Sequence, residues 1–286
     1  MESSLVTNLL LPLALGVVML GLGLSLTIDD FKRIARYPKA VLIGLATQTI
    51  VLVAIAYALT QWFALSPELS VGLMLLAASP GGATANIYSH LAKGDVALNI
   101  TLTAINSALA LITLPLIVNF SLAHFMGQEQ YVPPPTRKVV EVAAIIVFPV
   151  LIGMALRASR PRWAARLEKP IRIFAVLVLL AVILAAIGAE WDRLPGFIAA
   201  VGGACLAFNL LSIGVGYGLP RLLKLERSQS IAISMEIGIH NGTLAIFIAL
   251  NVLQNAQMSI PAAVYSIIMF LTAGVFAYGL TQQARS

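Results

Sequence analysis

One carboxylate and one imidazole stand inside a stretch of the chain that is otherwise apolar enough to cross a membrane. The segment SMEIGIHNGTLA, residues 234–245, carries Glu236, His240 and Asn241 between the apolar runs SIAI and IFIALNVL. The other eleven of the twelve acidic residues lie in expected loops or within about a turn of an expected helix end. A carboxylate in the middle of a bilayer costs at least about 2.5 kcal/mol, and no Lys or Arg falls in the central part of any apolar segment. Glu236 must therefore meet a mobile cation or carry a proton, the alternative being a protonated side chain that only hydrogen-bonds to a neighbouring helix.

Oxygen-bearing side chains on other apolar segments favour Na⁺ as the cation. A hard cation prefers carboxylate, hydroxyl, amide and carbonyl oxygens, and a broken helix provides carbonyls without intrahelical partners. Near Glu236 these would be the carbonyls of Ile237 and Ile239. The polar residues expected at the middle of other helices are Gln48, Asn86, Asn99, Thr103, Asn106 and Ser107. Each of them alone is typical of helix–helix hydrogen bonding, but together with a single carboxylate they predict a sodium site.

Two stretches of backbone amides predict an anion site. If helices restart after the breaks, the amides at Gly82, Ala83 and Thr84, and those at Asn241 and Gly242, begin new half-helices. Such N-termini hold a carboxylate or a sulfonate without a buried Arg. The residues thus favour a secondary transporter that couples a cation to an organic anion. An enzyme is disfavoured, because one deep Glu and one deep His are too few for a nucleophile–base pair or a common catalytic metal site.

The composition requires these groups to be positioned by membrane helices. Of 286 residues 59% are hydrophobic and only 10% charged, and the mean hydropathy is +0.94, whereas charged residues make up about a quarter of a soluble domain. Hydrophobic runs long enough to cross about 30 Å of hydrocarbon recur along the chain. We expect an all-α polytopic protein with about nine spans, near 5–26, 40–63, 69–92, 95–122, 138–157, 171–189, 195–219, 229–255 and 260–280.

The basic residues set the orientation of these spans. If the loop after the first span is cytoplasmic, fifteen of the eighteen Lys and Arg residues lie on the cytoplasmic side. This positive-inside pattern predicts an inner (plasma) membrane protein with its N-terminus outside and its C-terminus in the cytoplasm. The expected partners are the lipid bilayer and an organic anion, and not nucleic acid. The oligomeric state is left open, a monomer included.

Two of the spans are interrupted near their centres by helix-breaking residues. The span 69–92 contains Pro80, Gly81 and Gly82, and the span 229–255 contains Gly238 and Gly242. Proline removes a backbone donor and glycine tolerates non-helical dihedrals. The breaks occupy equivalent, oppositely directed spans of two halves, which are residues 1–122 with four helices and 138–286 with five. This pattern predicts inverted repeats with discontinuous helices and a binding site at the midplane.

The motifs PGGATAN, LAKGDVALNITLT and MEIGIHNG resemble the bile acid:sodium symporter family, in particular bacterial homologues of the apical sodium-dependent bile acid transporter. The resemblance implies a panel domain and a core domain whose broken helices cross, and symport of bile acids, pantoate or other organic anions by alternating access. It also implies one or two Na⁺ ions. The first site would use Asn86, Asn99, Thr103 and Glu236, and the second Gln48, Glu236, Ile237, Ile239 and His240. Asn241 would face the substrate.

Three departures from the family pattern bear on these sites. Ala85 replaces a hydroxyl residue, Asn99 a serine, and His240 a glutamine. Because imidazole is a weak Na⁺ ligand, we hypothesise that one Na⁺ binds firmly while His240 tunes the second site with pH. The alternatives are a proton-influenced carrier with one Na⁺ site and an arsenite-type efflux permease of the same fold. The permease is disfavoured because it needs a thiol in the first broken helix, whereas Cys205 lies in another span.

Overall fold

The computed structural model describes residues 11–32, 35–82, 84–127, 136–167, 169–171, 173–174, 177 and 194–283. These residues form helices joined by short turns, and no β-strand occurs among them. The elements are α2 (Leu11–Ser25), α3 (Ile28–Lys32), α4 (Pro38–Ala46), η3 (Thr47–Val51), α5 (Leu52–Trp62), α6 (Pro67–Ala78), α7 (Ala85–Leu91), α8 (Val96–Phe125), α9 (Thr136–Ser159), α11 (Leu194–Leu222), α12 (Arg227–Gly238), α13 (Gly242–Phe247), η5 (Ile248–Val252), η6 (Gln257–Ser259) and α14 (Ile260–Gln283). The predicted all-α class is confirmed for this part of the chain.

Four helices of the described chain have the length and apolar composition to cross a bilayer, namely Pro38–Trp62, Val96–Phe125, Ile198–Leu222 and Gln257–Gln282. Shorter apolar helices include Pro67–Ala78 and Gly242–Val252, which belong to the two spans predicted to be interrupted. The predicted span 171–189 lies almost wholly outside the described residues, and that at 5–26 lies partly outside them. The chain is thus a multi-pass membrane protein, and the number nine stays a prediction.

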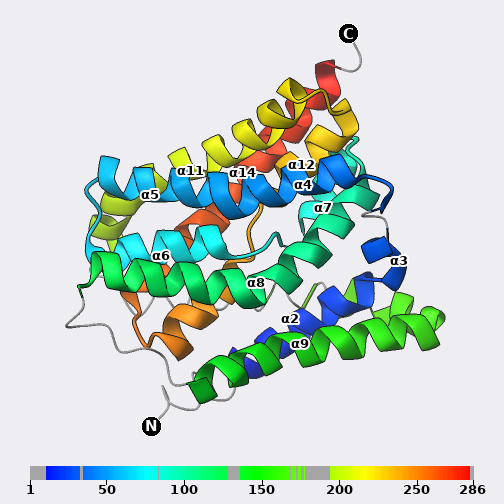
Figure 1. The fold of residues 1–286 in the computed structure, drawn as a ribbon, viewed down its shortest axis with the longest axis horizontal. Coiled ribbons are helices and arrows are strands. Elements are labelled where there is room, and N and C mark those ends of the chain that lie inside the picture. The colour runs from blue at the N-terminus through cyan, green and yellow to red at the C-terminus, as the bar shows by residue number, and fades with distance from the viewer. Residues whose placement is uncertain are drawn as a thin grey trace.

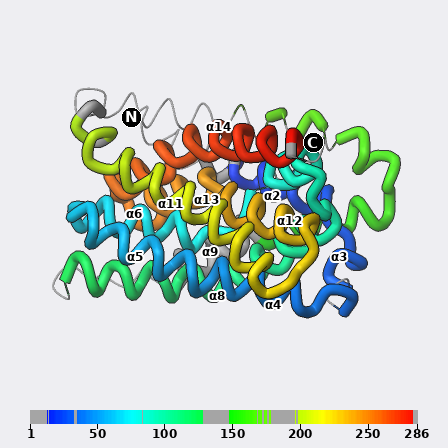
Figure 2. Tube along the Cα trace, turned by 90° about the horizontal axis from the view of Figure 1, so that it is seen from above, coloured from blue at the N-terminus to red at the C-terminus, as the bar shows by residue number. Residues whose placement is uncertain are grey.

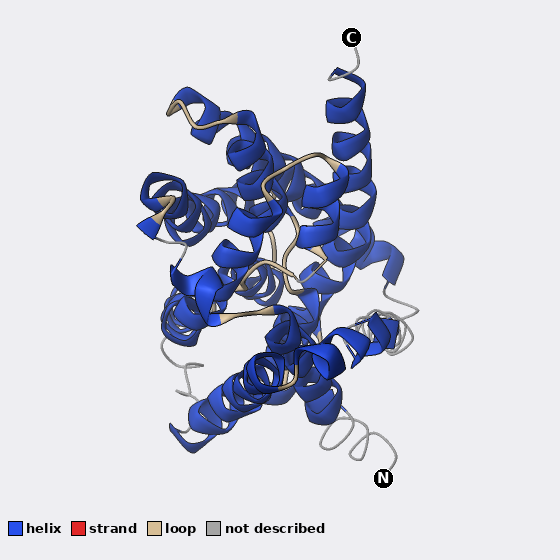
Figure 3. Cartoon of the chain, turned by 90° about the vertical axis from the view of Figure 1, so that its right-hand side faces the viewer, coloured by secondary structure: helices blue, strands red, loops and turns tan. Residues whose placement is uncertain are grey.

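The helices form a bundle with one pair set apart from it. Figure 1 shows α2 and α9 lying side by side below α8. Figure 3 shows the chain from the side, with helices joined by loops. Glycines allow this pair to pack closely, because a side chain at these positions would clash with the other helix. A Cβ added to Gly23 would lie 2.8 Å from the Cα of Val150, and one added to Gly153 would lie 2.7 Å from the backbone nitrogen of Leu24. In the bundle, α12 and α13 lie between α14 on one side and α8 on the other (Figure 2).

Both predicted helix breaks are present, and they lie against each other. The chain leaves helical geometry between α6 and α7 and again between α12 and α13. Gly81 and His240 form an isolated antiparallel bridge. The amide of Gly82 donates to the carbonyl of Ile239 at 2.7 Å, and the amide of Asn241 donates to the carbonyl of Pro80 at 2.9 Å. Each break therefore satisfies backbone groups that the other would leave unpaired. We call residues 79–82 and 239–241 the crossover.

Candidate cation site

Glu236 lies two residues before the end of α12 and is completely buried. Its carboxylate accepts hydrogen bonds from two side chains of α8, Thr103 Oγ1 at 2.6 Å and Asn106 Nδ2 at 3.3 Å. Within the described ranges, no Lys or Arg forms an ion pair with it. Its immediate surroundings thus supply neutral dipoles and no fixed counter-charge, which is the situation that attracts a mobile cation.

Gln48 and His240 meet at the carbonyl of Ser79 in the crossover. Gln48 Nε2 donates to the carbonyls of Ala77 at 3.1 Å and Ser79 at 3.0 Å. Nδ1 of His240 lies 3.1 Å from the same Ser79 oxygen. A carbonyl only accepts, so Nδ1 carries a proton, and in the neutral ring Nε2 carries the lone pair. The ring of His240 stacks on Phe208, with centroids 5.7 Å apart.

Several buried oxygens around the site have no protein donor, and they fit a hard cation. Gln48 Oε1, Asn99 Oδ1 and Asn106 Oδ1 have no hydrogen-bond partner among the residues that the structure describes. Leaving such an atom unsatisfied costs about 1–3 kcal/mol, and amide oxygens are good Na⁺ ligands. His240 Nε2 is likewise without a partner in the described part of the chain, but a nitrogen lone pair suits Na⁺ poorly. The donor set around Glu236 therefore fits Na⁺ better than the donor set around His240 does.

The predicted first-site residues occupy different positions around Glu236. Thr103 touches the carboxylate directly, whereas Asn99 lies one turn earlier on α8 and its Nδ2 donates to the carbonyl of Ala232 at 2.7 Å. Asn86 is the second residue of α7. Asn106 was noted in the sequence only as a polar residue at mid-depth, and the structure adds it to the partners of Glu236. Its position three residues after Thr103, on the same helix face, was the available signal.

The carbonyls at the end of α12 are partly engaged by other helices. Asn209 Nδ2 and Tyr265 Oη both donate to the carbonyl of Gly238, at 3.0 and 2.9 Å. The carbonyl of Ile239 accepts from Gly82, so only its second lone pair is open to a cation. Ile237 directly precedes Gly238, the last residue of α12. The hydrogen bonds from Asn209 and Tyr265 to Gly238 were not predicted from the sequence. Both residues lie in helices for which no break was predicted, so nothing drew attention to them.

The amides predicted to hold an anion are largely paired within the crossover. Those of Gly82 and Asn241 donate across it, and that of Gly242 donates to the carbonyl of His240 at 3.0 Å. The side chain of Asn241 caps α13 by accepting from the amide of Leu244 at 3.0 Å. Thr84 directly precedes α7, and Ala83 lies outside the described residues. Anion binding at these positions stays a prediction.

Comparisons with known proteins converge on one kind of transporter. The family model described as "Sodium Bile acid symporter family" matches residues 12–195, more than half of the chain. An "Uncharacterized sodium-dependent transporter YocS" of Bacillus subtilis (strain 168) is 25% identical over 264 residues, which are 92% of this chain and 80% of that protein. A "Probable sodium/metabolite cotransporter BASS2, chloroplastic" of Oryza sativa subsp. japonica is 26% identical over 273 residues, covering 94% of this chain and 63% of the rice protein.

A mammalian protein is also similar. The "Hepatic sodium/bile acid cotransporter" of Rattus norvegicus is 27% identical over 239 residues, covering 82% of this chain and 65% of the rat protein. The chain therefore spans less than two thirds of the length of the rice and rat proteins. All three relatives are named for sodium dependence or cotransport.

Proposed function

Because the chain belongs to the sodium bile acid symporter family, whose members are sodium-dependent transporters, we propose that it couples Na⁺ entry to the uptake of an organic anion by alternating access. The observation that carries this proposal is Glu236, a buried carboxylate that contacts two neutral donors of α8. A bound Na⁺ offsets its charge in a low-dielectric environment, where an uncompensated charge is costly. The site then becomes neutral when the ion is bound, which favours movement of the loaded carrier.

The proposed substrate is a bile acid-like molecule, pantoate or another carboxylate. The name of the rat relative, a sodium/bile acid cotransporter, and that of the rice relative, a sodium/metabolite cotransporter, support this class. The sodium-dependent relatives do not favour a proton-influenced carrier or an arsenite permease. We place the protein in an inner (plasma) membrane, with its N-terminus outside, because fifteen of the eighteen basic residues then lie on the cytoplasmic side.

A thermal-shift panel tests the proposal most directly. The purified protein is heated with each of a set of organic carboxylates and sulfonates, once in Na⁺ and once in K⁺. We expect at least one carboxylate to stabilise the protein in Na⁺ and not in K⁺, because ligands that bind only the native state add RT ln(1 + [L]/Kd) to its stability. The hit is then followed as a labelled solute in proteoliposomes, where it should accumulate unchanged. Equal shifts in both salts, or conversion of the solute, would contradict the proposal.

For the ion stoichiometry we propose one firmly bound Na⁺, at Glu236, with the second site weakened by His240. In His240→Gln an amide oxygen replaces a nitrogen lone pair, so a second Na⁺ should bind. We expect the slope of the free energy of unfolding, in units of RT, against ln[Na⁺] to rise from about 1 toward about 2 at Na⁺ concentrations above Kd, because each bound ion adds its own RT ln(1 + [Na⁺]/Kd). The titration is read from thermal stability. His124→Gln is the control, because the ring of His124 packs against Tyr57, Phe120 and Phe125, away from the crossover. An unchanged slope in His240→Gln would show that His240 is not the residue that weakens the second site.

A further inference from the structure

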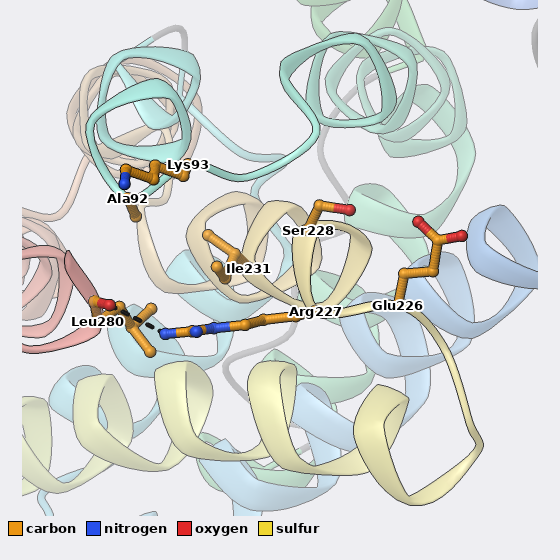
Figure 4. Close-up of a pocket in the computed structure, with 7 residues that line it drawn as sticks. All are labelled: Ala92, Lys93, Glu226, Arg227, Ser228, Ile231 and Leu280. Carbon is orange, nitrogen blue, oxygen red and sulfur yellow. Dashed lines mark hydrogen bonds between the residues drawn. The ribbon is translucent and has the colours of Figure 1, made fainter. Parts of the chain in front are cut away.

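A pocket of about 360 Å³ opens at one end of the bundle, where the ends of α7, α12 and α14 meet (Figure 4). Its lining residues are Ala92, Lys93, Glu226, Arg227, Ser228, Ile231 and Leu280. This volume falls in the range of small-molecule sites, about 300–1,000 Å³. Leu280 lies near the end of the apolar span Gln257–Gln282. The pocket therefore stands at the level of the bilayer at which lipid headgroups lie.

Two cationic side chains lie on one side of this pocket. Figure 4 shows the nitrogen ends of Lys93 and Arg227 on the side of Leu280, and the carboxylate of Glu226 at the opposite end. Arg227 Nη2 donates to the carbonyl of Leu280 at 2.9 Å, which uses one of the five N–H donors of a guanidinium. Among the described residues, no carboxylate lies within ion-pair distance of either cation. The two positive charges therefore suit an anion from outside the chain.

Other basic side chains at this end of the bundle are also paired with neutral groups. Arg221 Nη1 and Lys39 Nζ donate to backbone carbonyls of the turn between α11 and α12, at 2.8 and 2.7 Å. The nearby carboxylate of Asp95 accepts from the amide of Leu98 at 3.0 Å and caps α8. The cations thus keep their charge without a carboxylate partner in the described part of the chain, and the local field favours an anion.

Exposed apolar and aromatic side chains of α7 and α14 border the pocket. Leu91 of α7, which directly precedes the lining residues of that helix end, is largely exposed, and so are Val275 and Tyr278 of α14. The two helices pack together, because the hydroxyl of Tyr88 donates to the carbonyl of Phe270 at 3.1 Å and the two rings stack. We call Leu91, Val275 and Tyr278 the apolar border. In a chain that spans a bilayer, such a surface contacts acyl chains.

We propose that this pocket binds an anionic phospholipid, whose phosphate is held by Lys93 and Arg227 and whose acyl chains lie against the apolar border. Basic pockets between transmembrane helices on the cytoplasmic side are typical sites for anionic headgroups, and the distribution of basic residues places this end of the bundle on that side. A free phosphate would use the two cations alone, whereas a phospholipid uses the cations and the apolar border together. The site needs neither Glu236 nor Na⁺, so it goes beyond the proposed ion coupling.

Native mass spectrometry of the purified full chain, in detergent without Na⁺, tests the site. Dioleoyl phosphatidylglycerol and dioleoyl phosphatidylcholine are titrated separately, because they share their acyl chains and differ in headgroup charge. We expect the first phosphatidylglycerol to bind at least about tenfold more tightly than the first phosphatidylcholine. This preference should fall about fivefold in Lys93→Gln and again in Arg227→Gln, which is the effect of one basic residue at an anionic membrane surface.

Lys224→Gln is the matched control. Lys224 is an exposed lysine with a φ of 61°, as Lys93 is, and it lies in the turn between α11 and α12 without lining the pocket. It should keep the wild-type preference. An equal loss in Lys224→Gln would indicate a diffuse effect of surface charge and would overturn the site. Equal binding of the two lipids by the wild-type protein would overturn it as well.

Two further measurements keep the outcomes distinct. Displacement of phosphatidylglycerol by inorganic phosphate at a similar concentration would show a free-phosphate site and overturn the lipid proposal. Glu236→Gln should bind phosphatidylglycerol as the wild type does, so a failure of ion coupling and a failure of the lipid site are separate results. Arg227→Gln also removes the hydrogen bond to Leu280, so its fold is checked by melting without lipid. Lys93→Gln removes no side-chain hydrogen bond within the described chain and decides the result if Arg227→Gln is unstable.

Discussion

We expect Glu236→Gln to abolish the Na⁺-specific stabilisation of the protein while leaving its fold intact. The substitution keeps a side chain of similar shape near Thr103 and Asn106 but removes the negative charge of Glu236. The loss of this charge should weaken Na⁺ binding at least about a hundredfold, or about 2.8 kcal/mol. In K⁺ the melting temperature should stay equal or rise, because a neutral amide costs less to bury than a carboxylate.

The measurement is a pair of melting curves, in Na⁺ and in K⁺. Wild-type protein at Na⁺ concentrations of about ten times Kd should gain about 1.4 kcal/mol, and Glu236→Gln should gain nothing. Glu68→Gln is the matched control, since Glu68 lies in the first turn of α6, away from the crossover. In proteoliposomes Glu236→Gln should no longer accumulate the anion against its gradient. Retained accumulation with an unchanged need for Na⁺ would refute Glu236 as the coupling residue.

The second large effect is expected for Gly81→Ala in the crossover. A Cβ at Gly81 would overlap the carboxyl group of Glu236, with Oε2 only 2.6 Å away. The backbone of Gly81 does not lie in the left-handed region, so the alanine introduces a clash and no dihedral strain. Either the carboxylate or the Gly81–His240 bridge must move. We expect a loss of at least about tenfold in Na⁺ affinity, together with a loss of about 1–3 kcal/mol in stability from overpacking.

A sodium titration of thermal stability measures both quantities for Gly81→Ala. Gly274→Ala is the control, because its nearest described atom, Cε1 of Tyr88, would be 3.9 Å from the new methyl group. The control should match wild type in both quantities. If Gly81→Ala were destabilised but bound Na⁺ as tightly as wild type, the close approach of the crossover to Glu236 would have no part in ion binding.

The sequence by itself determined the all-helical membrane class of the protein and singled out its buried Glu236. Composition required membrane helices, and the absence of deep Lys or Arg singled out Glu236 before any contact was known. Pro80, Gly81, Gly82, Gly238 and Gly242 located both helix breaks, because these residue types act on their own backbone. Such properties are local, so they can be read without knowing which segments meet.

Which atoms face Glu236 was decided only by the tertiary structure. All residues from Leu69 to Ala78 in α6 and from Ser230 to Gly238 in α12 are buried. A helix that is buried on every side has no single apolar face that periodicity could orient. The pairing of α8 with α12, and so the contact of Asn106 with Glu236 and of Asn99 with Ala232, follows from interhelical register. Likewise, the amides of Gly82 and Asn241 are paired across the crossover because two chain segments more than 150 residues apart meet there.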